Sequence, residues 1–225
     1  MIKIGDKTIN PTKIICIGTN YMDHIEETKL PIPKEPVLFP KTLNCLIGDG
    51  DPIIYPKLLF NNRKLKRVDY EVELAFIIKD KCKDVSKSEI YNHIIGYTVF
   101  NDVTARRMQT KDILSQLPWF RSKSLDTFGP IGPRIASIGE IQDPHDLKIE
   151  LKVNGEVKQS SNTKHLLFKV PDLMEYITSL FTMEPGDIVA TGTPAGIGPV
   201  LPGDIIEATI EKIGTLTNKV ILEGE

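Results

Sequence analysis

The sequence predicts a β-dominated α+β fold, and three observations support this fold class. Proline and glycine recur at short intervals, and most segments between them are apolar and β-branched, a pattern typical of strands joined by tight turns. In the segment LKIELKVNGEVKQS, Asn154 and Gly155 tolerate the positive φ that a two-residue hairpin turn requires. Helical periodicity is confined to three short segments, so we expect sheet to make up most of the core.

Two further turns predict strands in the C-terminal third. Residues 184–187 read Glu-Pro-Gly-Asp and residues 201–204 read Leu-Pro-Gly-Asp, and both sequences are typical of β-turns. The first turn precedes the run IVATG and the second precedes IIEATIEKI. We expect each of these runs to be a strand.

Helices are predicted near YMDHIEE (residues 21–27), at TARRMQTKDILSQ (104–116) and at VPDLMEYITSLF (170–181). In the third segment, Pro171 suits the first turn of a helix. An apolar stripe repeats there at helical spacing and is expected to pack in the core: Leu173, Tyr176, Ile177 and Leu180.

Composition indicates an ordinary globular protein. The chain has 225 residues, of which 40% are hydrophobic and 26% are charged, so we expect one folded domain over residues 1–225. No run approaches the roughly 18 apolar residues that span a bilayer, and the N-terminus lacks the apolar core of a signal peptide. We therefore expect a cytoplasmic protein without a membrane contact. The formal net charge of -2 gives no general attraction to nucleic acid.

The three cysteines are expected to be buried free thiols. Cys16, Cys45 and Cys82 are widely spaced and form no CxxC pair, so neither a disulfide framework nor a zinc knuckle is predicted.

Two glutamates share one face of a strand in the segment VDYEVELAFIIKD. Side chains alternate along a strand, so the residues from Tyr70 to Ile78 at even positions face the core, and Glu71 and Glu73 lie on the other face. That face is also partly apolar, so the two carboxylates need basic partners, a proton or a cation. Ligands that are all oxygen favour a hard cation such as Mg²⁺. A solvated edge strand is the alternative interpretation.

A third carboxylate, Asp102, ends the apolar run HIIGYTVFND just before the second predicted helix. Considered alone, it is better interpreted as a cap of that helix, because Asp is a preferred capping residue.

Several motifs together resemble the fumarylacetoacetate hydrolase family. DYEVELAFIIKD followed by GYTVFNDVTARRMQ is similar to its metal-binding core, GTNYMDHIEE to its lid helix, RSKSLDTFGPIGP to its KSxDTFxPxGP loop, and ATGTPAGIGP to its TGTPxGxG loop. These motifs run in the family's order from residue 16 to residue 199. The chain resembles the short, single-domain branch. It differs from many relatives in having Thr42 rather than proline after Lys41, which leaves the role of Lys41 open.

The resemblance implies the family's mixed β-sheet roll, commonly dimeric, and a set of site residues. Glu71, Glu73 and Asp102 would bind Mg²⁺, with Mn²⁺ as the other candidate, and no organic cofactor is expected. Lys123 matches the active-site lysine that counters negative charge on the substrate, although by itself it reads as an exposed loop lysine.

His24 and Glu27 match the family's acid–base dyad. They are three residues apart, so on a helical turn they lie on one face and can form a hydrogen bond. By itself, His24 would be interpreted as ordinary surface.

Three residues are candidates for substrate binding. Arg106 and Gln109 are three apart on a predicted helix and could reach a substrate carboxylate, and a solvated helix face is the alternative. In TGTPAGIGP, glycine N–H groups and Thr193 could bind an anion, but no GK[ST] follows, which excludes a nucleotide P-loop. A plain turn between strands is the alternative there.

The expected function is therefore metal-dependent chemistry on an enolisable 2-oxo acid. The first hypothesis is hydrolysis of a C–C bond in an acylpyruvate. Decarboxylation of oxaloacetate and isomerisation or tautomerisation of 2-hydroxydiene diacids use the same enolate chemistry and stay open. A non-catalytic module with a structural cation is the alternative from another class. A homodimer is the expected assembly.

Overall fold

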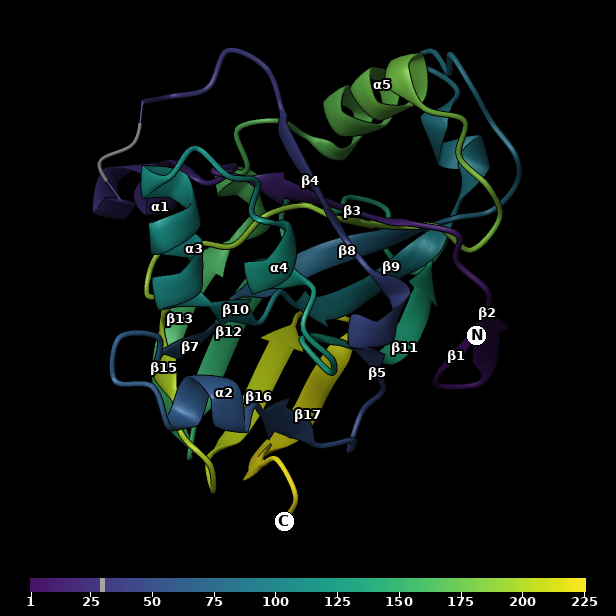
Figure 1. Ribbon diagram of the computed structural model, residues 1–225. Helices are drawn as coiled ribbons and strands as arrows, with labels where there is room; N and C mark the ends of the chain where they lie inside the picture. Colours follow the sequence, from purple (N-terminus) through teal and green to yellow (C-terminus); the bar gives the residue numbers. More distant parts are fainter. Residues whose placement is uncertain (29–30) are drawn as a thin grey trace.

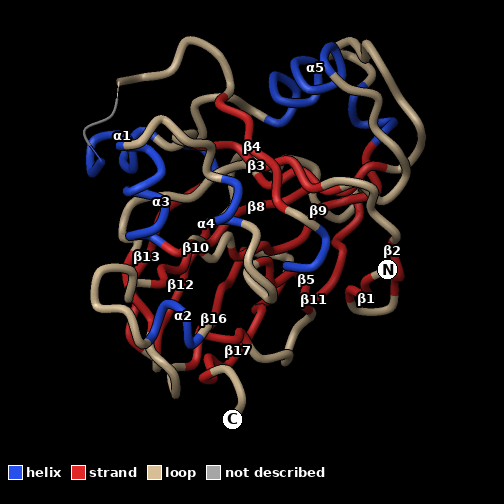
Figure 2. Tube along the Cα trace, viewed as in Figure 1, coloured by secondary structure: helices blue, strands red, loops and turns tan. Residues whose placement is uncertain are grey.

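The computed structural model describes residues 1–28 and 31–225. Strands from all parts of the chain build its centre, and the helices lie around them (Figures 1 and 2). This confirms the predicted β-dominated α+β fold. Residues 29 and 30, which closely follow the predicted lid helix, lie outside the described residues.

A seven-stranded mixed sheet contains the strand of Glu73. In spatial order its strands are β4 (Val37–Lys41), β3 (Ile14–Gly18), β14 (Ile188–Ala190), β8 (Val72–Ile78), β9 (Ile94–Asn101), β11 (Gly129–Ser137) and β5 (Leu46–Ile47). β14 pairs with β3 in parallel and with β8 in antiparallel orientation. Every residue of β8 is buried, as expected for a central strand covered on both faces.

A five-stranded sheet packs against this first sheet. Its spatial order is β13 (Glu156–Asn162), β12 (Lys148–Val153), β16 (Ile205–Ile210), β17 (Gly214–Leu222) and β6 (Ile53–Tyr55). β16 and β17 lie against β9, while α5 lies on the far side of the seven-stranded sheet (Figure 1). Inward-facing aliphatic side chains of both sheets belong to one buried cluster.

The predicted turns are confirmed. Asn154 and Gly155 have φ of 53° and 79° and join β12 to β13, which fits the primed turn expected for an Asn-Gly hairpin. The two Pro-Gly-Asp turns precede β14 and β16, as the sequence predicts.

Two smaller sheets complete the strands of the described ranges. One has the order β10 (Thr104–Ala105), β7 (Val68–Tyr70) and β15 (Gly198–Val200), and the other is the hairpin of β1 (Ile2–Ile4) and β2 (Lys7–Ile9).

The three predicted helices are present. The α-helices are α1 (Met22–Thr28), α2 (Lys57–Phe60), α3 (Arg106–Leu114), α4 (Phe120–Lys123) and α5 (Val170–Leu180), and the 3-10 turns are η1 (Leu43–Cys45), η2 (Ile90–His93) and η3 (Thr163–His165). Pro171 lies in the first turn of α5, as predicted. None of the described helices is long and apolar enough to cross a membrane.

The core stripe of α5 differs in part from the prediction. Leu173 and Ile177 are buried, but Leu180 is 51% exposed and Tyr176 is only half-buried. Met174 and Thr178 are buried in their place. The buried face of α5 is therefore rotated relative to the predicted one. Both faces have helical spacing, and the packing of the whole helix decides which of them is covered.

The prediction of three buried free cysteines is confirmed for Cys16, Cys45 and Cys82.

Candidate active site

The segment that contains the two glutamates is interrupted at Glu71. β7 ends at Tyr70 and β8 begins at Val72, and the two strands belong to different sheets. At Glu71 the backbone N–H donates to Asn101 Oδ1 at 2.9 Å, and the Glu71 carbonyl accepts from Asp102 N–H at 2.8 Å. The prediction of one continuous strand is therefore wrong at Glu71, because Asn101 at the end of β9 and Asp102 just after it take over its backbone bonds.

Asp102 comes to the glutamates because β8 and β9 are antiparallel neighbours, with Val72 opposite Asn101. Its carboxylate is completely buried and accepts from Lys41 Nζ at 2.6 Å and from Lys123 Nζ at 2.5 Å. The N-cap of α3 is Ala105, so the interpretation of Asp102 as a helix cap is not realised.

The three carboxylates form one buried cluster. One oxygen from each of Glu71, Glu73 and Asp102 lies within 4.8 Å of the other two. An octahedral cation with metal–oxygen bonds of about 2.1 Å needs ligand oxygens roughly 3 to 4.2 Å apart. Small side-chain movements therefore suffice for these oxygens to bind one hard cation.

Glu71 is held in its charged form by basic neighbours. Lys123 Nζ donates to its Oε2 at 2.9 Å, and Arg106 Nη2 donates to its Oε1. Burial by itself would raise the pKa of Glu71, but Lys123 and Arg106 outweigh it and lower this pKa well below its usual range.

Glu73 has the opposite environment. Its Oε2 accepts from the Gly192 N–H at 2.8 Å, and no lysine, arginine or histidine of the described ranges forms an ion pair with it. Burial, Asp102 and Glu71 all raise the pKa of Glu73. A bound divalent cation would counter the repulsion from the neighbouring carboxylates that raises this pKa. Because the donor set is all oxygen, it suits Mg²⁺ or Mn²⁺, and the residues present therefore fit such an ion.

Lys123 lies inside the cluster, not on an exposed loop. The residue is 2% exposed, and its ammonium group bridges Asp102 and Glu71. Burial by itself would lower its pKa, but the two carboxylates raise the pKa of Lys123 above its usual value. Lys41 donates to Asp102 and to the carbonyl of Val103, so it orients the third carboxylate from behind.

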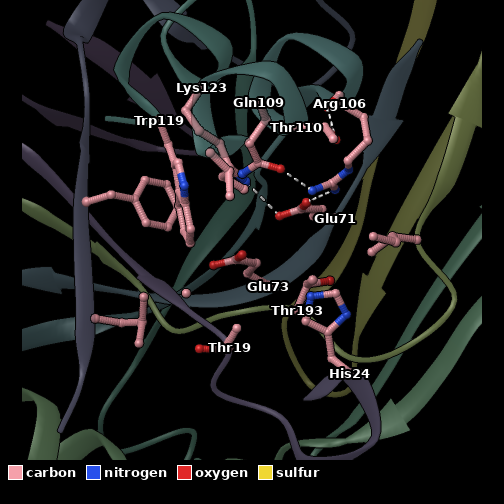
Figure 3. A pocket seen from close by; sticks show the side chains of 15 residues that line it. Thr19, His24, Glu71, Glu73, Arg106, Gln109, Thr110, Trp119, Lys123 and Thr193 are labelled. Atoms are coloured by element: carbon pink, nitrogen blue, oxygen red, sulfur yellow. Dashed lines mark hydrogen bonds and ion pairs between the residues drawn. The ribbon is translucent and has the colours of Figure 1, made fainter. Parts of the chain in front are cut away.

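A cavity of about 290 Å³ opens beside the cluster (Figure 3). Its polar lining includes the predicted residues Glu71, Glu73, His24, Lys123, Arg106, Gln109 and Thr193. Its apolar lining consists of Ile17, Phe39, Ile113, Trp119 and Ile197. Among the predicted ligands, Asp102 is absent from the lining because it is fully buried behind Lys123 and Lys41.

The predicted hydrogen bond between His24 and Glu27 is formed beside this cavity. His24 Nδ1 and Glu27 Oε2 are 3.2 Å apart on α1, and Figure 3 shows the His24 ring on the side of the cavity where Thr193 lies. The Gly196 N–H donates to both Glu27 oxygens at 3.2 and 3.3 Å, which ties α1 to the TGTPAGIGP loop. His24 is thus brought to the cavity that Glu71 and Glu73 line.

The predicted substrate-binding residues line the cavity but are engaged with one another or with the protein. Arg106 donates to Gln109 Oε1 at 2.5 Å and to Asp69 Oδ2 at 2.8 Å, besides its bond to Glu71. Thr193 Oγ1 accepts from Gln159 Nε2 at 2.9 Å. These bonds fix the orientation of each group before any substrate enters.

Sequence reasoning missed Gln159 and Asn101. Gln159 accepts from Val72 N–H at 3.0 Å and donates to Thr193 and to the Pro194 carbonyl, so it joins the start of β8 to the TGTP loop. Gln159 lies outside the family motifs and Asn101 lies within GYTVFNDVTARRMQ, but a single polar side chain in a strand carries no sign that it faces inward.

Relatives of known sequence and structure resemble the whole chain. The family model described as Fumarylacetoacetate (FAA) hydrolase C-terminal matches residues 13–221, so the chain belongs to the fumarylacetoacetate hydrolase family. An uncharacterized protein of Methanocaldococcus jannaschii is 50% identical over 97% of this chain and 88% of that protein. The mitochondrial oxaloacetate tautomerase fahd2 of Xenopus laevis is 41% identical over 94% of this chain and 66% of that protein.

Two solved structures that are similar to this chain belong to enzymes with different activities. The 2-hydroxyhepta-2,4-diene-1,7-dioate isomerase from Mycobacterium marinum is 40% identical, with a TM-score of 0.84 over 96% of this chain and 77% of that chain. Fumarylpyruvate hydrolase from Pseudomonas aeruginosa, in complex with Mn²⁺ and pyruvate, is 28% identical to this chain. Its TM-score is 0.88, over 97% of this chain and 93% of that chain. The mixed β-sheet roll expected from the family resemblance is thereby confirmed.

Proposed function

We propose that this protein is a divalent-metal-dependent enzyme that acts on enolisable 2-oxo acids. One observation carries the proposal: Glu71, Glu73 and His24, whose ring pairs with Glu27, line the same cavity. Glu71, Glu73 and Asp102 would hold the cation, which when bound polarises the oxygens of a 2-oxo acid and so eases loss of a proton or a carbon group from C3. The relative crystallised with Mn²⁺ and pyruvate supports this choice of metal and substrate class.

Hydrolysis of an acylpyruvate is the reaction that we propose first. With a proton on Nδ1 donated to Glu27, the Nε2 of His24 is the acceptor nitrogen for a proton of water. The resulting hydroxide attacks the distal carbonyl, and the C–C bond to the pyruvate part breaks. Pyruvate leaves as its enolate and is protonated at C3, so that water is consumed and a carboxylate and pyruvate are formed.

Lys123, Arg106, Gln109 and Thr193 have proposed roles in the same reaction. The ammonium group of Lys123 lies 2.9 Å from Glu71 at the cavity and can offset negative charge that develops on the leaving enolate. Gln109 and Thr193 are placed to contact a substrate carboxylate, while Arg106 orients Gln109 and Glu71.

Isomerisation or tautomerisation of a 2-oxo diacid is the second candidate. The observation in its favour is that the named isomerase and the named tautomerase are 40% and 41% identical to this chain, against 28% for the named hydrolase. The same His24 would then move a proton between carbon and base without activating water.

A substrate panel tests the two candidates. Acylpyruvates, 2-hydroxydiene diacids and oxaloacetate would be incubated with the protein in Mg²⁺ or Mn²⁺, and products identified by mass. Cleavage of an acylpyruvate to pyruvate and a second acid supports the hydrolase. Turnover of dienes or of enol oxaloacetate with every acylpyruvate intact replaces it with the isomerase. Metal binding without turnover of any of them contradicts both and favours a structural cation.

A further inference from the structure

A second cluster of metal-ligand side chains lies at the other end of β8. Asp80 and Cys82 follow the end of this strand, and His93 ends η2. One donor atom from each of these residues lies within 4.8 Å of the other two. Glu73 lies five residues before the end of β8 at Ile78, about 16 Å along the strand, and Asp80 lies beyond that end, so this cluster is distinct from the carboxylates at the cavity.

The backbone fixes the three side chains relative to one another. Lys79 N–H donates to the carbonyl of His93 at 2.9 Å, which places the chain after β8 beside the end of η2. Cys82 exchanges two backbone hydrogen bonds with Met183, at 3.0 and 2.9 Å. Backbone hydrogen bonds therefore hold residues 79–82 against both the end of η2 and the segment at Met183, and the three side chains meet there.

The donor atoms differ in chemistry from those at the cavity. His93 Nδ1 lies 2.5 Å from Asp80 Oδ1, and the Cys82 side chain is nearly buried beside them. A thiolate and an imidazole select borderline metals such as Zn²⁺ over Mg²⁺, and one carboxylate completes a common set of three. Burial of Cys82 is the main reason that its pKa is raised, to about 11. The nearby carboxylates of Asp80, Asp187 and Glu184 raise this pKa further.

We propose that Asp80, Cys82 and His93 bind a Zn²⁺ ion that clips the end of β8 to the start of β9. Tetrahedral zinc with these ligands needs donor atoms roughly 3.3 to 3.7 Å apart, with water at the fourth position. The side chains of Asp80 and His93 are 48% and 29% exposed, so both can adjust by the ångström or so that this requires while Cys82 stays in place.

Cobalt substitution tests the proposal directly. Metal-free protein would be titrated with Co²⁺ in excess Mg²⁺, which occupies the oxygen-only site, and the thiolate-to-cobalt charge-transfer absorption would be followed. We expect one equivalent of Co²⁺ to give this absorption and one equivalent of Zn²⁺ to remove it. Wild-type protein without the absorption overturns the proposal, and Asp80 and His93 are then a surface ion pair only.

Variants identify the ligands. Cys82→Ser should abolish the absorption, whereas Cys45→Ala and Cys16→Ala should retain it, and Cys16 is the more demanding control because it lies near Asp102 and Glu73. Absorption that survives Cys82→Ser, or that disappears in Cys16→Ala alone, contradicts the assignment.

Two variants at half-exposed positions avoid the risk that Cys82→Ser does not fold. Asp80→Asn and His93→Gln should each weaken Zn²⁺ affinity by about tenfold or more, because even the loss of a residue that only hydrogen-bonds to a metal ligand lowers affinity by about that much. Zinc should also raise the thermal midpoint of the wild type by more than that of Asp80→Asn. Equal zinc affinity and equal thermal shifts in wild type and both variants would refute the site.

Discussion

Glu73 is the residue whose charge depends most on a cation. It is buried beside two other carboxylates and accepts one backbone hydrogen bond, whereas Glu71 and Asp102 each have two basic partners. We expect Glu73→Gln to remove most Mg²⁺ affinity and activity while the free energy of unfolding without metal stays equal or rises. Calorimetric titration with Mg²⁺ and denaturant unfolding in EDTA measure the two effects.

The matched control for Glu73→Gln is Glu175→Gln, an exposed glutamate on α5, a helix that contributes no residue to the cavity lining. It should leave Mg²⁺ affinity unchanged. Wild-type Mg²⁺ affinity in Glu73→Gln, Glu71→Gln and Asp102→Asn would rule out the proposed ligand set.

His24 should act on the reaction and not on the metal. We expect His24→Ala to lower acylpyruvate hydrolysis by about 10² to 10⁴-fold, the loss typical for removal of a general base, with nearly unchanged Mg²⁺ affinity. Tautomer exchange of oxaloacetate should fall less, because it depends mainly on polarisation of the substrate oxygens. Steady-state kinetics on both substrates separate the effects.

His165→Ala is the control, since His165 is exposed and lies outside the cavity. A parallel loss of hydrolysis and tautomer exchange in His24→Ala, with Mg²⁺ affinity retained, would assign His24 to a proton transfer that both reactions share.

At the scale of elements, one turn holds β3 and β14 together. Asp187 ends the turn before β14, and its Oδ1 accepts from Thr12 N–H at 2.7 Å and Lys13 N–H at 3.0 Å. Its Oδ2 accepts from Lys13 Nζ at 2.5 Å and from the Glu184 N–H at 2.8 Å. Asp187 therefore fixes the parallel register of two central strands.

We expect Asp187→Asn to lower the free energy of unfolding by about 2 to 4 kcal/mol, because several partly buried donors lose a charged acceptor that is itself fully buried. Burial by itself would raise the pKa of Asp187, but the bonds from Lys13, Glu184 and Thr12 lower it below its usual value. The stabilisation is thus present above the unfolded pKa of about 4 and is lost as pH falls below it. Urea unfolding of both proteins at pH 7 and pH 3 measures the difference.

Asp204 offers a matched control in the second Pro-Gly-Asp turn. Its Oδ2 accepts from the Leu201 N–H at 2.8 Å in a solvent-exposed setting. Asp204→Asn should cost less than about 1 kcal/mol. Equal losses in the two variants would show that the turn sequence and not the buried contacts of Asp187 sets the stability.

At the scale of the whole molecule, the cation should couple to folding. Glu71 lies where β7 gives way to β8, and Asp102 lies just after β9, so an ion that binds them holds two sheets together. Mg²⁺ at about 100 times its dissociation constant would add roughly 2.7 kcal/mol of stability. For a chain of this size that corresponds to a rise of about 5 to 10 °C in the thermal midpoint.

Differential scanning calorimetry in Mg²⁺ and in EDTA checks this prediction. Glu73→Gln should lose most of the shift, and Asp80→Asn should keep it because Mg²⁺ avoids thiolate and imidazole ligands. An equal Mg²⁺ shift in Glu73→Gln would place the ion elsewhere. The homodimer and the cytoplasmic location inferred from the sequence stay predictions, and sedimentation measures the first.

The sequence by itself determined the β-dominated fold class, the three predicted turns and the family. Asn154-Gly155 and the two Pro-Gly-Asp turns act through local backbone preferences, which short sequences encode fully. The grouping of Glu71, Glu73 and Asp102 was also predictable, but only from the resemblance, because spacing alone left Asp102 as a helix cap.

Only the tertiary structure decided which groups surround these carboxylates. The break at Glu71 depends on Asn101 and Asp102, and the contacts of Asp102 come from Lys41 and Lys123, all distant in sequence from Glu71. The meeting of Cys82 with His93 follows in the same way from the neighbouring strands β8 and β9. Such contacts depend on how whole strands pair and pack, and no local pattern carries that information.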